Sequence, residues 1–215
     1  NVASPTANPK SGLDFQTAAK MTQIARDIEY TFINGVYAKA TSDTTANKTR
    51  GLVSAIETSV IDKNDKPLGY WDVVNMLETI KGENAPLQGL VIWCDATTLL
   101  QINADALRND MTVMPESRNE NGINITQLVT PFGNIGMYAG EFLPAGTALV
   151  LNLGVLSPVH QPVPGKGTFF LEELAKTGGG GRDQMFVQLG LDHGPEWYHG
   201  KVTGINTSFA PPPTP

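Results

Sequence analysis

The most regular hydrophobic pattern in the chain lies between Asp14 and Val36. Apolar side chains recur there at steps of three and four residues, which places them on one face of an α-helix. They are Phe15, Ala18, Met21, Ala25, Ile28, Phe32 and Val36. About 22 residues at ~1.5 Å per residue make a rod of roughly 33 Å. We therefore predict one long, continuous helix, with Phe15, Ile28 and Phe32 buried along its apolar face.

The chain then alternates between helical and extended patterns. A polar linker covers 41–48, and the apolar run GLVIWC that ends at Cys94 is typical of a buried strand. Asp95 stands where an N-cap belongs, before a further helical pattern. We expect helices at about 52–58 and 70–80 and from Asp95 to about 107, a turn at 63–67, and a strand at 88–94.

From Met111 onward the pattern favours β-structure. Apolar runs at 123–130 and 134–139 flank Pro131-Phe132-Gly133, which predicts a hairpin. Residues 158–167 are rich in Pro and Gly, so a loop is expected there rather than a ladder strand. We expect strands at 147–153, 184–191 and 197–205, a short strand or helical turn at 169–176, and a glycine hinge at 178–181. Helices and strands in this order indicate an α+β fold, a sheet layer with covering helices.

Charge and composition limit the classes of function. Acidic residues outnumber basic ones by 21 to 15, for a net charge of −6. This argues against a protein that grips nucleic acid through its phosphates, which requires clustered Lys and Arg. The single cysteine, Cys94, excludes an intrachain disulfide and fits a reducing compartment. The sequence contains no run of ~18 apolar residues, so it predicts no membrane-spanning helix.

Two groups of residues suggest chemistry. Cys94 is a possible nucleophile with His160, His193 or His199 as its base, but a cysteine inside an apolar strand is more typical of an inert core residue. Asp192, His193, Glu196 and His199 form a possible metal site. Gly194-Pro195 excludes helical ligand spacing there, so a polar turn between two strands is favoured.

The remaining motifs are weaker. Gly178–Gly181 with Arg182 lacks the helix and the Lys-Ser/Thr pair of a phosphate loop, so a hinge is favoured. Glu172-Glu173 has no spacing that favours acid–base catalysis. Two roles are open for Arg50. Its guanidinium donates hydrogen bonds to backbone carbonyls or to a neighbouring carboxylate, or it is a solvated surface residue. We therefore predict a protein that is not an enzyme, with no catalytic, cofactor-binding or metal-binding residues and no cofactor.

Four segments in order carry a resemblance to a known family. They are RDIEYTFINGVY with a linker and TRGL, then VTPFGNIGMYAG, then LVLNLGVLSPVHQPVPGKGTFFLEELAKTG, then VQLGLDHGPEWYHGKVTGI. Over about 14–205 the chain resembles the major capsid proteins of tailed bacteriophages, with the Hong Kong ninety-seven type of shell fold. The resemblance implies a phage major capsid protein fold with a long spine helix, a peripheral domain and an axial domain.

That resemblance implies a division of the chain. Residues 1–13 are expected to be a loose N-terminal segment, 14–51 the spine helix and linker of the peripheral domain, and 52–177 the axial domain. Residues 178–206 are expected to be strands returning to the peripheral domain, and 207–215 a disordered Pro-rich tail. In such families an N-terminal arm and a long extended loop precede the spine helix. Here they would lie before Asn1, so the sequence is expected to be a fragment that lacks them.

The implied function is structural. The chain is expected to be a subunit of an icosahedral phage or prophage capsid, assembled in the bacterial cytoplasm as pentamers and hexamers that enclose double-stranded DNA without binding it specifically. Its implied partners are other copies of itself, with portal, scaffold, protease and decoration proteins, and no membrane. Two alternatives stay open: an encapsulin-like compartment shell, and a cytosolic hydrolase using Cys94 or the Asp192–His199 cluster.

Overall fold

The computed structural model describes residues 12–42, 44–108, 113–120, 123–175 and 182–208. Its helices are α1 (Gly12–Asn34), α2 (Leu52–Ala55), α3 (Tyr70–Gly82) and α4 (Ala96–Arg108), with the 3-10 turn η1 (Glu196–Tyr198). Its strands are β1 (Val60–Lys66), β2 (Leu90–Cys94), β3 (Val113–Glu120), β4 (Ile123–Thr130), β5 (Gly133–Ala139), β6 (Ala148–Asn152), β7 (Ser157–His160), β8 (Phe169–Leu174), β9 (Arg182–Val187), β10 (Leu189–Asp192) and β11 (Gly200–Ile205).

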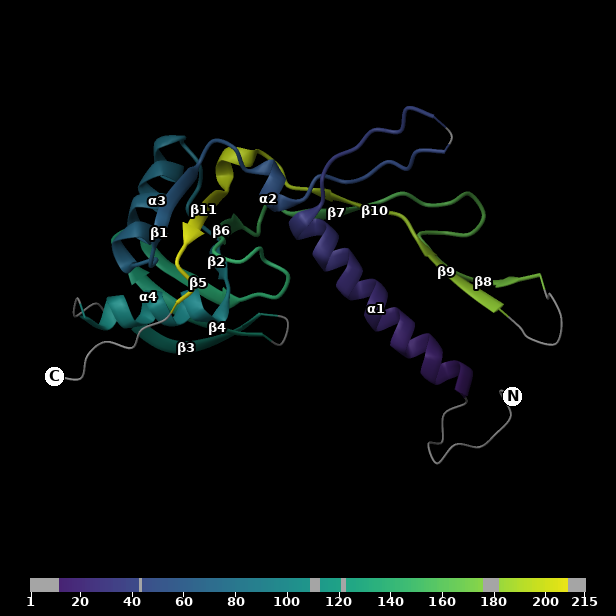
Figure 1. The fold of residues 1–215 in the computed structure, drawn as a ribbon, viewed down its shortest axis with the longest axis horizontal. Helices are drawn as coiled ribbons and strands as arrows, with labels where there is room; N and C mark the ends of the chain where they lie inside the picture. The colour runs from purple at the N-terminus through teal and green to yellow at the C-terminus, as the bar shows by residue number, and fades with distance from the viewer. Residues whose placement is uncertain (1–11, 43, 109–112, 121–122, 176–181, 209–215) are drawn as a thin grey trace.

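The molecule consists of a packed body and three projecting parts (Figure 1). The body contains α2, α3, α4, η1, the strands β1 to β6, and β11. The projecting parts are α1, the linker hairpin (residues 36–42 and 44–50), and a ribbon formed by β7 to β10. All three leave the body on the same side, so the fold has one compact end and one open end.

A seven-stranded sheet in the order β1-β11-β6-β2-β5-β4-β3 organises the body. β1 runs parallel to β11 and β2 parallel to β5, while the other neighbours are antiparallel. β11 follows the ribbon in the sequence, yet it lies between β1 and β6. The body is therefore built from chain segments on both sides of the ribbon.

Alternation along β6 shows how the sheet is covered. Ala148 and Val150 belong to the main core with α3 and α4, whereas Leu149 and Leu151 belong to a second cluster with α2. Successive side chains of a strand point to opposite faces, so α2 covers the face opposite to α3 and α4. All five residues of β6 are buried because this strand is covered on both faces.

The ribbon consists of two antiparallel pairs, β7 with β10 and β8 with β9. The loop predicted at 158–167 is wrong for its first residues, because Pro158 lies within β7 opposite Leu191. Both strands of a two-stranded sheet are edge strands, and an edge strand tolerates a proline. The undecided segment 169–176 is mainly the strand β8, and the predicted hinge at 178–181 lies outside the described residues.

Most other predicted elements of the body are confirmed. α3, α4, β2, β6 and the hairpin of β4 and β5 stand within a few residues of their expected positions. The turn predicted at 63–67 is wrong, because β1 continues through it to Lys66. The turn-forming residues Asn64 and Asp65 have positive φ angles of 48° and 61° and coincide with a register shift in that strand. They bend the edge strand instead of ending it.

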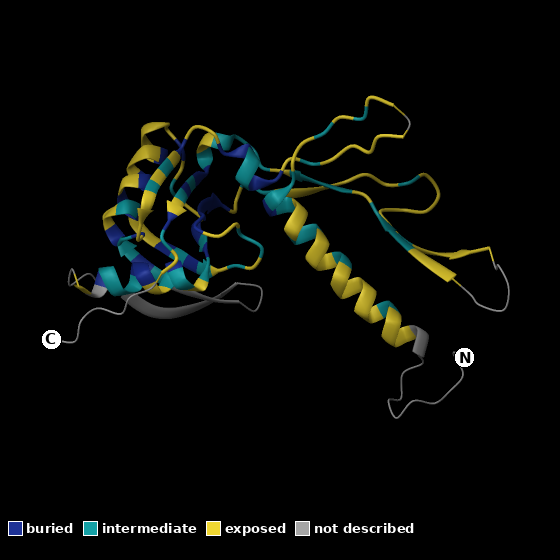
Figure 2. Cartoon of the chain, in the orientation of Figure 1, coloured by how far each residue is buried: buried dark blue, intermediate teal, exposed yellow. Residues whose placement is uncertain are grey.

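The long helix is confirmed, but its predicted burial is wrong. α1 is continuous from Gly12 to Asn34. Phe15 is 62% exposed, and Ile28 and Phe32 are only half-buried. Figure 2 shows that most of α1 is exposed. The physical reason is that α1 projects from the body, so no element packs closely over its apolar face. None of the helices in the described ranges combines the length and hydropathy that crossing a bilayer requires.

Candidate assembly surface

The projecting parts carry most of the large apolar side chains that are exposed among the described residues. They are Phe15, Met21 and Tyr30 on α1, Val36 and Tyr37 in the linker hairpin, and Val159, Phe169, Leu171 and Leu174 in the ribbon. Scattered exposed apolar residues are ordinary, but a concentration of them marks an interaction site. We call this set the assembly surface.

A groove lies between α1 and the outer pair of ribbon strands, β8 and β9. It encloses about 850 Å³. Its lining combines apolar side chains such as Phe15, Leu171 and Leu174 with polar ones such as Lys20 and Arg182. A smaller groove of about 230 Å³ follows the helix toward the body, between Ile28 and Val187. The helix and the ribbon therefore lie side by side with open space between them, and do not form a packed core.

The C-terminal part of α1 contacts the body through the loop that follows β5. The side-chain amide of Asn34 donates a hydrogen bond to the carbonyl of Phe142 at 2.6 Å. The ring of Tyr30 meets the Phe142 ring edge-on, with centroids 6.0 Å apart. Arg26 forms an ion pair with Glu141 at 3.1 Å. Sequence reasoning missed Phe142, because no local motif distinguishes it from other apolar loop residues.

Two glycines form the joint where α1 meets α2. The Gly51 amide donates to the Gly35 carbonyl at 2.8 Å, and the Ser54 hydroxyl donates to the same carbonyl at 2.7 Å. A Cβ atom on Gly51 would lie 2.4 Å from the Gly35 nitrogen. The two backbones thus touch with no side chain between them, and only glycine fits. The sequence pattern gave no sign of this contact between Gly35 and Gly51.

The linker hairpin projects from this joint. Ala38 and Lys48 exchange backbone hydrogen bonds of 3.3 and 2.9 Å, which pair the two sides of the hairpin. At its base, the Arg50 guanidinium donates to the Glu57 carboxylate at 2.8 Å, and both side chains are largely exposed. Arg50 therefore binds a carboxylate of its own chain, one of the two roles that the sequence left open.

Comparison with known protein families identifies the family of this chain. The model of the SU10 major capsid protein family matches residues 1–206. The chain is a member of that family. It is therefore a structural capsid subunit, as the resemblance to tailed-phage capsid proteins predicted, and its place is the virion capsid. No curated protein matches the sequence significantly.

Solved structures show the fold of this capsid protein. It is similar to the holo-SrpI encapsulin complex from Synechococcus elongatus PCC 7942, at 11% identity and a TM-score of 0.71 over 95% of this chain and 70% of that one. It is also similar to Mycobacterium phage Patience, at 10% identity and a TM-score of 0.60 over 93% of this chain and 65% of that one. The cyanophage A-1(L) capsid asymmetric unit is similar at 15% identity and a TM-score of 0.61, over 90% of this chain and 69% of that one. The α+β fold is therefore the predicted Hong Kong ninety-seven type.

Cys94 of this capsid protein is unsuited to nucleophilic catalysis. It is fully buried, as predicted, at the end of β2. Burial, with a smaller contribution from the negative charge of Asp95, raises the pKa of the Cys94 thiol to about 12. A thiol is nucleophilic only as its thiolate, so Cys94 stays protonated near neutral pH and serves as a packing residue.

The Asp192–His199 residues make hydrogen bonds that link separate parts of the chain. Glu196 accepts the amides of Glu57 and Thr58 at 3.0 and 3.1 Å, and also the Thr58 hydroxyl. Burial alone would raise the pKa of Glu196, but these hydrogen bonds outweigh it and lower that pKa. Within the described ranges, no three His, Cys, Asp or Glu side chains are grouped so as to hold a metal ion.

His199 is a buried link between the body and the ribbon. Its Nδ1 accepts the Asn152 amide at 3.1 Å, and its Nε2 lies 2.8 Å from the His193 carbonyl. These partners require a neutral ring with the proton on Nε2. Burial is the main cause that lowers the pKa of His199 below its ordinary value. His199 therefore holds the end of β6 to the turn that follows β10.

Proposed function

We propose that this chain is the repeating subunit of an icosahedral phage shell, in which pentamers and hexamers of it enclose double-stranded DNA. The observation that supports this most directly is the assembly surface. A body with its own core needs no partner to fold, whereas an exposed helix and a two-stranded ribbon do not bury their apolar residues alone. Repeating one such contact by symmetry closes a container.

The strand pairing supports a division into two domains. The proposed axial domain is the body, which starts near Leu52 as the sequence analysis expected and also includes β11. The proposed peripheral domain is α1 with the ribbon. Pairing of β8 with β9 and of β7 with β10 joins residues on both sides of the expected boundary at 177/178. The end of β6 and the start of β11 are therefore better boundaries.

The acidic balance of the chain supports a container that encloses DNA without binding it tightly. A protein that binds DNA tightly needs clusters of Lys and Arg to neutralise the phosphates. A reduced, buried Cys94 is compatible with assembly in the host cytoplasm. Portal, scaffold, protease and decoration proteins complete the set of partners that we propose from the family.

A pair of substitutions tests the role of the assembly surface. Leu171 and Leu100 are 51% and 53% exposed, the first in β8 and the second on α4 of the body. We expect Leu171→Asp to abolish capsomers and shells, and Leu100→Asp to leave them unchanged. Sedimentation velocity and electron microscopy of the purified full-length protein measure both. Normal assembly of the Leu171→Asp variant, or absence of capsomers from the full-length wild-type protein, would contradict the proposal.

The encapsulin-like shell is a second candidate, favoured by the likeness to the Synechococcus encapsulin over 95% of this chain. The two functions differ in cargo. Shells purified from an expressing host should contain DNA that nuclease cannot reach if the chain is a phage capsid protein. A shell that holds one enzyme in stoichiometric amount and no DNA would favour the encapsulin-like function.

A further inference from the structure

Phe142 has an unusual backbone conformation. Its φ angle is 64°, in the left-handed region. The other non-glycine residues with positive φ in the described chain are Asn64, Asp65 and Asn84, which are residue types that tolerate this region. A bulky residue adopts it only where surrounding contacts compensate for the strain. The neighbours of Phe142 therefore identify what holds the loop in place.

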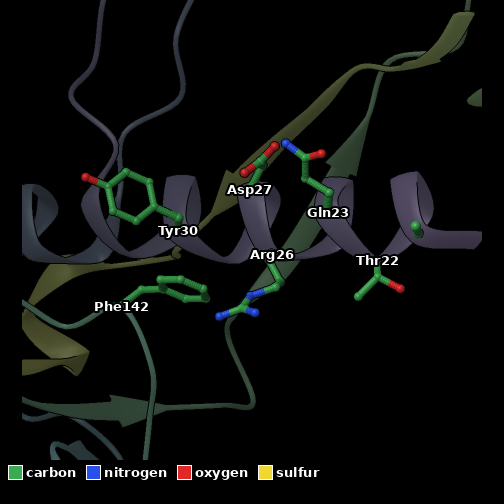
Figure 3. A pocket seen from close by; sticks show the side chains of 7 residues that line it. Thr22, Gln23, Arg26, Asp27, Tyr30 and Phe142 are labelled. Carbon is green, nitrogen blue, oxygen red and sulfur yellow. The ribbon is translucent and has the colours of Figure 1, made fainter. Parts of the chain in front are cut away.

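Three contacts of Phe142 come from one face of α1. Asn34, Tyr30 and Arg26 are spaced four residues apart, so they form a single row along the helix. Asn34 donates to the Phe142 carbonyl, Tyr30 meets its ring edge-on, and the Arg26 guanidinium lies 5.3 Å from the ring centroid. Figure 3 shows the Phe142 ring beside the helix, near Tyr30 and Arg26. α1 thus holds Phe142 in its strained conformation.

These contacts are easily broken. The side chains of Arg26 and Glu141 are 61% and 68% exposed, so water competes for their ion pair. A groove of about 500 Å³ opens beside Phe142, lined by residues from Ala19 to Tyr30. From Asp14 onward, Ile33 is the one buried residue of α1. Separation of the helix from Phe142 would therefore leave the core of the body closed.

The joint of Gly35 and Gly51 would remain after such a separation. Its hydrogen bonds join backbone atoms and the Ser54 hydroxyl at the very end of α1, and they do not depend on Phe142. Because glycine has no Cβ atom, Gly35 and Gly51 accept changes of their own backbone angles that other residues would not. The structure thus combines a fixed end with a contact about two helical turns long that is weak and strained.

We propose that Phe142 is a releasable latch that sets the angle between α1 and the body, with the joint of Gly35 and Gly51 as its pivot. On release, Phe142 relaxes to negative φ, which offsets part of the lost contact with Tyr30 and Arg26. This inference rests on the proposed shell function, because copies in pentamers and hexamers meet their neighbours at different angles. One chain then fits both environments by engaging or releasing the same contact.

Distances between two spin labels test the latch. Ala18→Cys on α1 and Glu78→Cys on α3 place labels at exposed positions, and buried Cys94 stays unlabelled. Double electron–electron resonance on the unassembled protein should give a narrow distance distribution. Adding Phe142→Ala should broaden it at least twofold. Phe132→Ala, which truncates an exposed phenylalanine in the turn between β4 and β5, is the matched control and should leave it narrow. An unchanged distribution with Phe142→Ala would overturn the proposal.

Phe142→Gly separates strain from contact. Glycine adopts positive φ without strain but lacks the ring. If the contacts of the ring hold α1, the Phe142→Gly variant should show the same broad distance distribution as Phe142→Ala. A narrow distribution with the glycine variant would show that the ring does not set the angle, and would contradict the latch. Near-ultraviolet circular dichroism is the control for folding of the body. The spectra of both variants should match that of the wild type.

The latch and the shell function fail separately. Electron microscopy of the wild-type protein tests the shell, while the distance measurement uses unassembled subunits. If shells form and Phe142→Ala leaves the distances unchanged, the latch alone is wrong. If the distances broaden and the wild type forms no shells, the latch moves α1 as inferred but its role in shell geometry is overturned. With both present, Phe142→Ala should assemble shells of more varied diameter than the wild type.

Discussion

The helices α1 and α3 have similar patterns in the sequence but different environments in the structure. α3, in the body, buries six of its thirteen residues. α1 is ten residues longer, yet from Asp14 onward it buries Ile33 alone. Both have an apolar stripe at helical spacing. The stripe thus predicts that a helix forms and which side is apolar, but it does not tell whether the same chain or another chain covers that side.

The sharpest test of this difference compares truncations in the two helices. Leu77 on α3 is fully buried. Leu77→Ala should lower the free energy of unfolding by about 2–5 kcal/mol, because it removes packed atoms and leaves a cavity. Phe15→Ala on α1 should change it by less than about 0.5 kcal/mol, as for exposed positions in general.

Urea unfolding of unassembled subunits, monitored by tryptophan fluorescence, measures both changes. Phe15→Ala should instead weaken assembly, which sedimentation velocity detects. A loss of subunit stability from Phe15→Ala as large as that from Leu77→Ala would show that α1 has its own buried face after all.

The joint of Gly35 and Gly51, which connects α1 to the body, gives the next largest expected effect. Gly51→Ala places a Cβ atom 2.4 Å from the Gly35 nitrogen. Relieving that clash should cost about 1–3 kcal/mol. Gly82→Ala at the end of α3 meets no atom within 4 Å and should stabilise by roughly 0.5–1 kcal/mol. Thermal unfolding of the two variants compares them directly, and equal melting temperatures would refute the close contact.

His199 makes the link between body and ribbon sensitive to pH. Its folded pKa is lowered by burial, so below about pH 6.5 the unfolded chain takes up a proton more readily than the folded one. Stability is therefore complete above about pH 6.5 and is lost as pH falls through the lower, folded pKa. The lowered pKa of Glu196 acts in the same direction at more acidic pH, below about 4.3.

His199→Gln isolates this contribution. Glutamine also offers an acceptor for Asn152 and a donor for the His193 carbonyl, but it does not titrate. Urea unfolding at about pH 7.5 and about pH 5.5 should show a smaller loss for His199→Gln than for the wild type. His160→Gln, at an exposed residue of β7, should behave like the wild type. An identical pH dependence of all three proteins would exclude His199 as the titrating group.

Two ion pairs give the smallest expected difference. Arg50–Glu57 and Lys63–Asp72 have nearly equal distances of 2.8 and 2.7 Å. The first pair, at the base of the linker hairpin, has side chains 45% and 68% exposed; the second, in the body, has 14% and 26%. Double-mutant cycles should give roughly 0.2–1 kcal/mol for the exposed pair and more for the body pair. A larger coupling energy for Arg50–Glu57 would contradict this order.

The sequence predicted the body better than the projecting parts. α3, α4 and the hairpin of β4 and β5 followed from local periodicity and turn residues, and Cys94 is buried as its apolar strand indicated. The exposure of Phe15 did not follow, because it depends on which other surfaces are present. The left-handed backbone of Phe142 is equally hidden, since contacts with α1 impose it and the loop sequence does not.

Turn chemistry misled where a strand lies at an edge. Asn64 and Asp65 are typical turn residues, and Pro158 is typical of a loop, yet each lies within a strand. An edge strand has one side free of partners, so it accommodates a bend or a missing amide that a central strand would not. The polar residues from Asp192 to His199 were rightly interpreted as a turn, but the burial of His199 had no signal in the sequence.

The position of β11 has a consequence for the order of folding. Gly200–Ile205 fills the gap between β1 and β6, and its Val202 and Ile205 complete the core. During synthesis, more than a hundred residues of the body leave the ribosome before this strand does. Until it arrives, β1 has no neighbour in the large sheet, and its pairing closes a long loop late. A nascent chain thus exposes its ribbon and long helix before it has a finished body, and cells that produce many copies at once must keep those chains apart until residue 205 is in place.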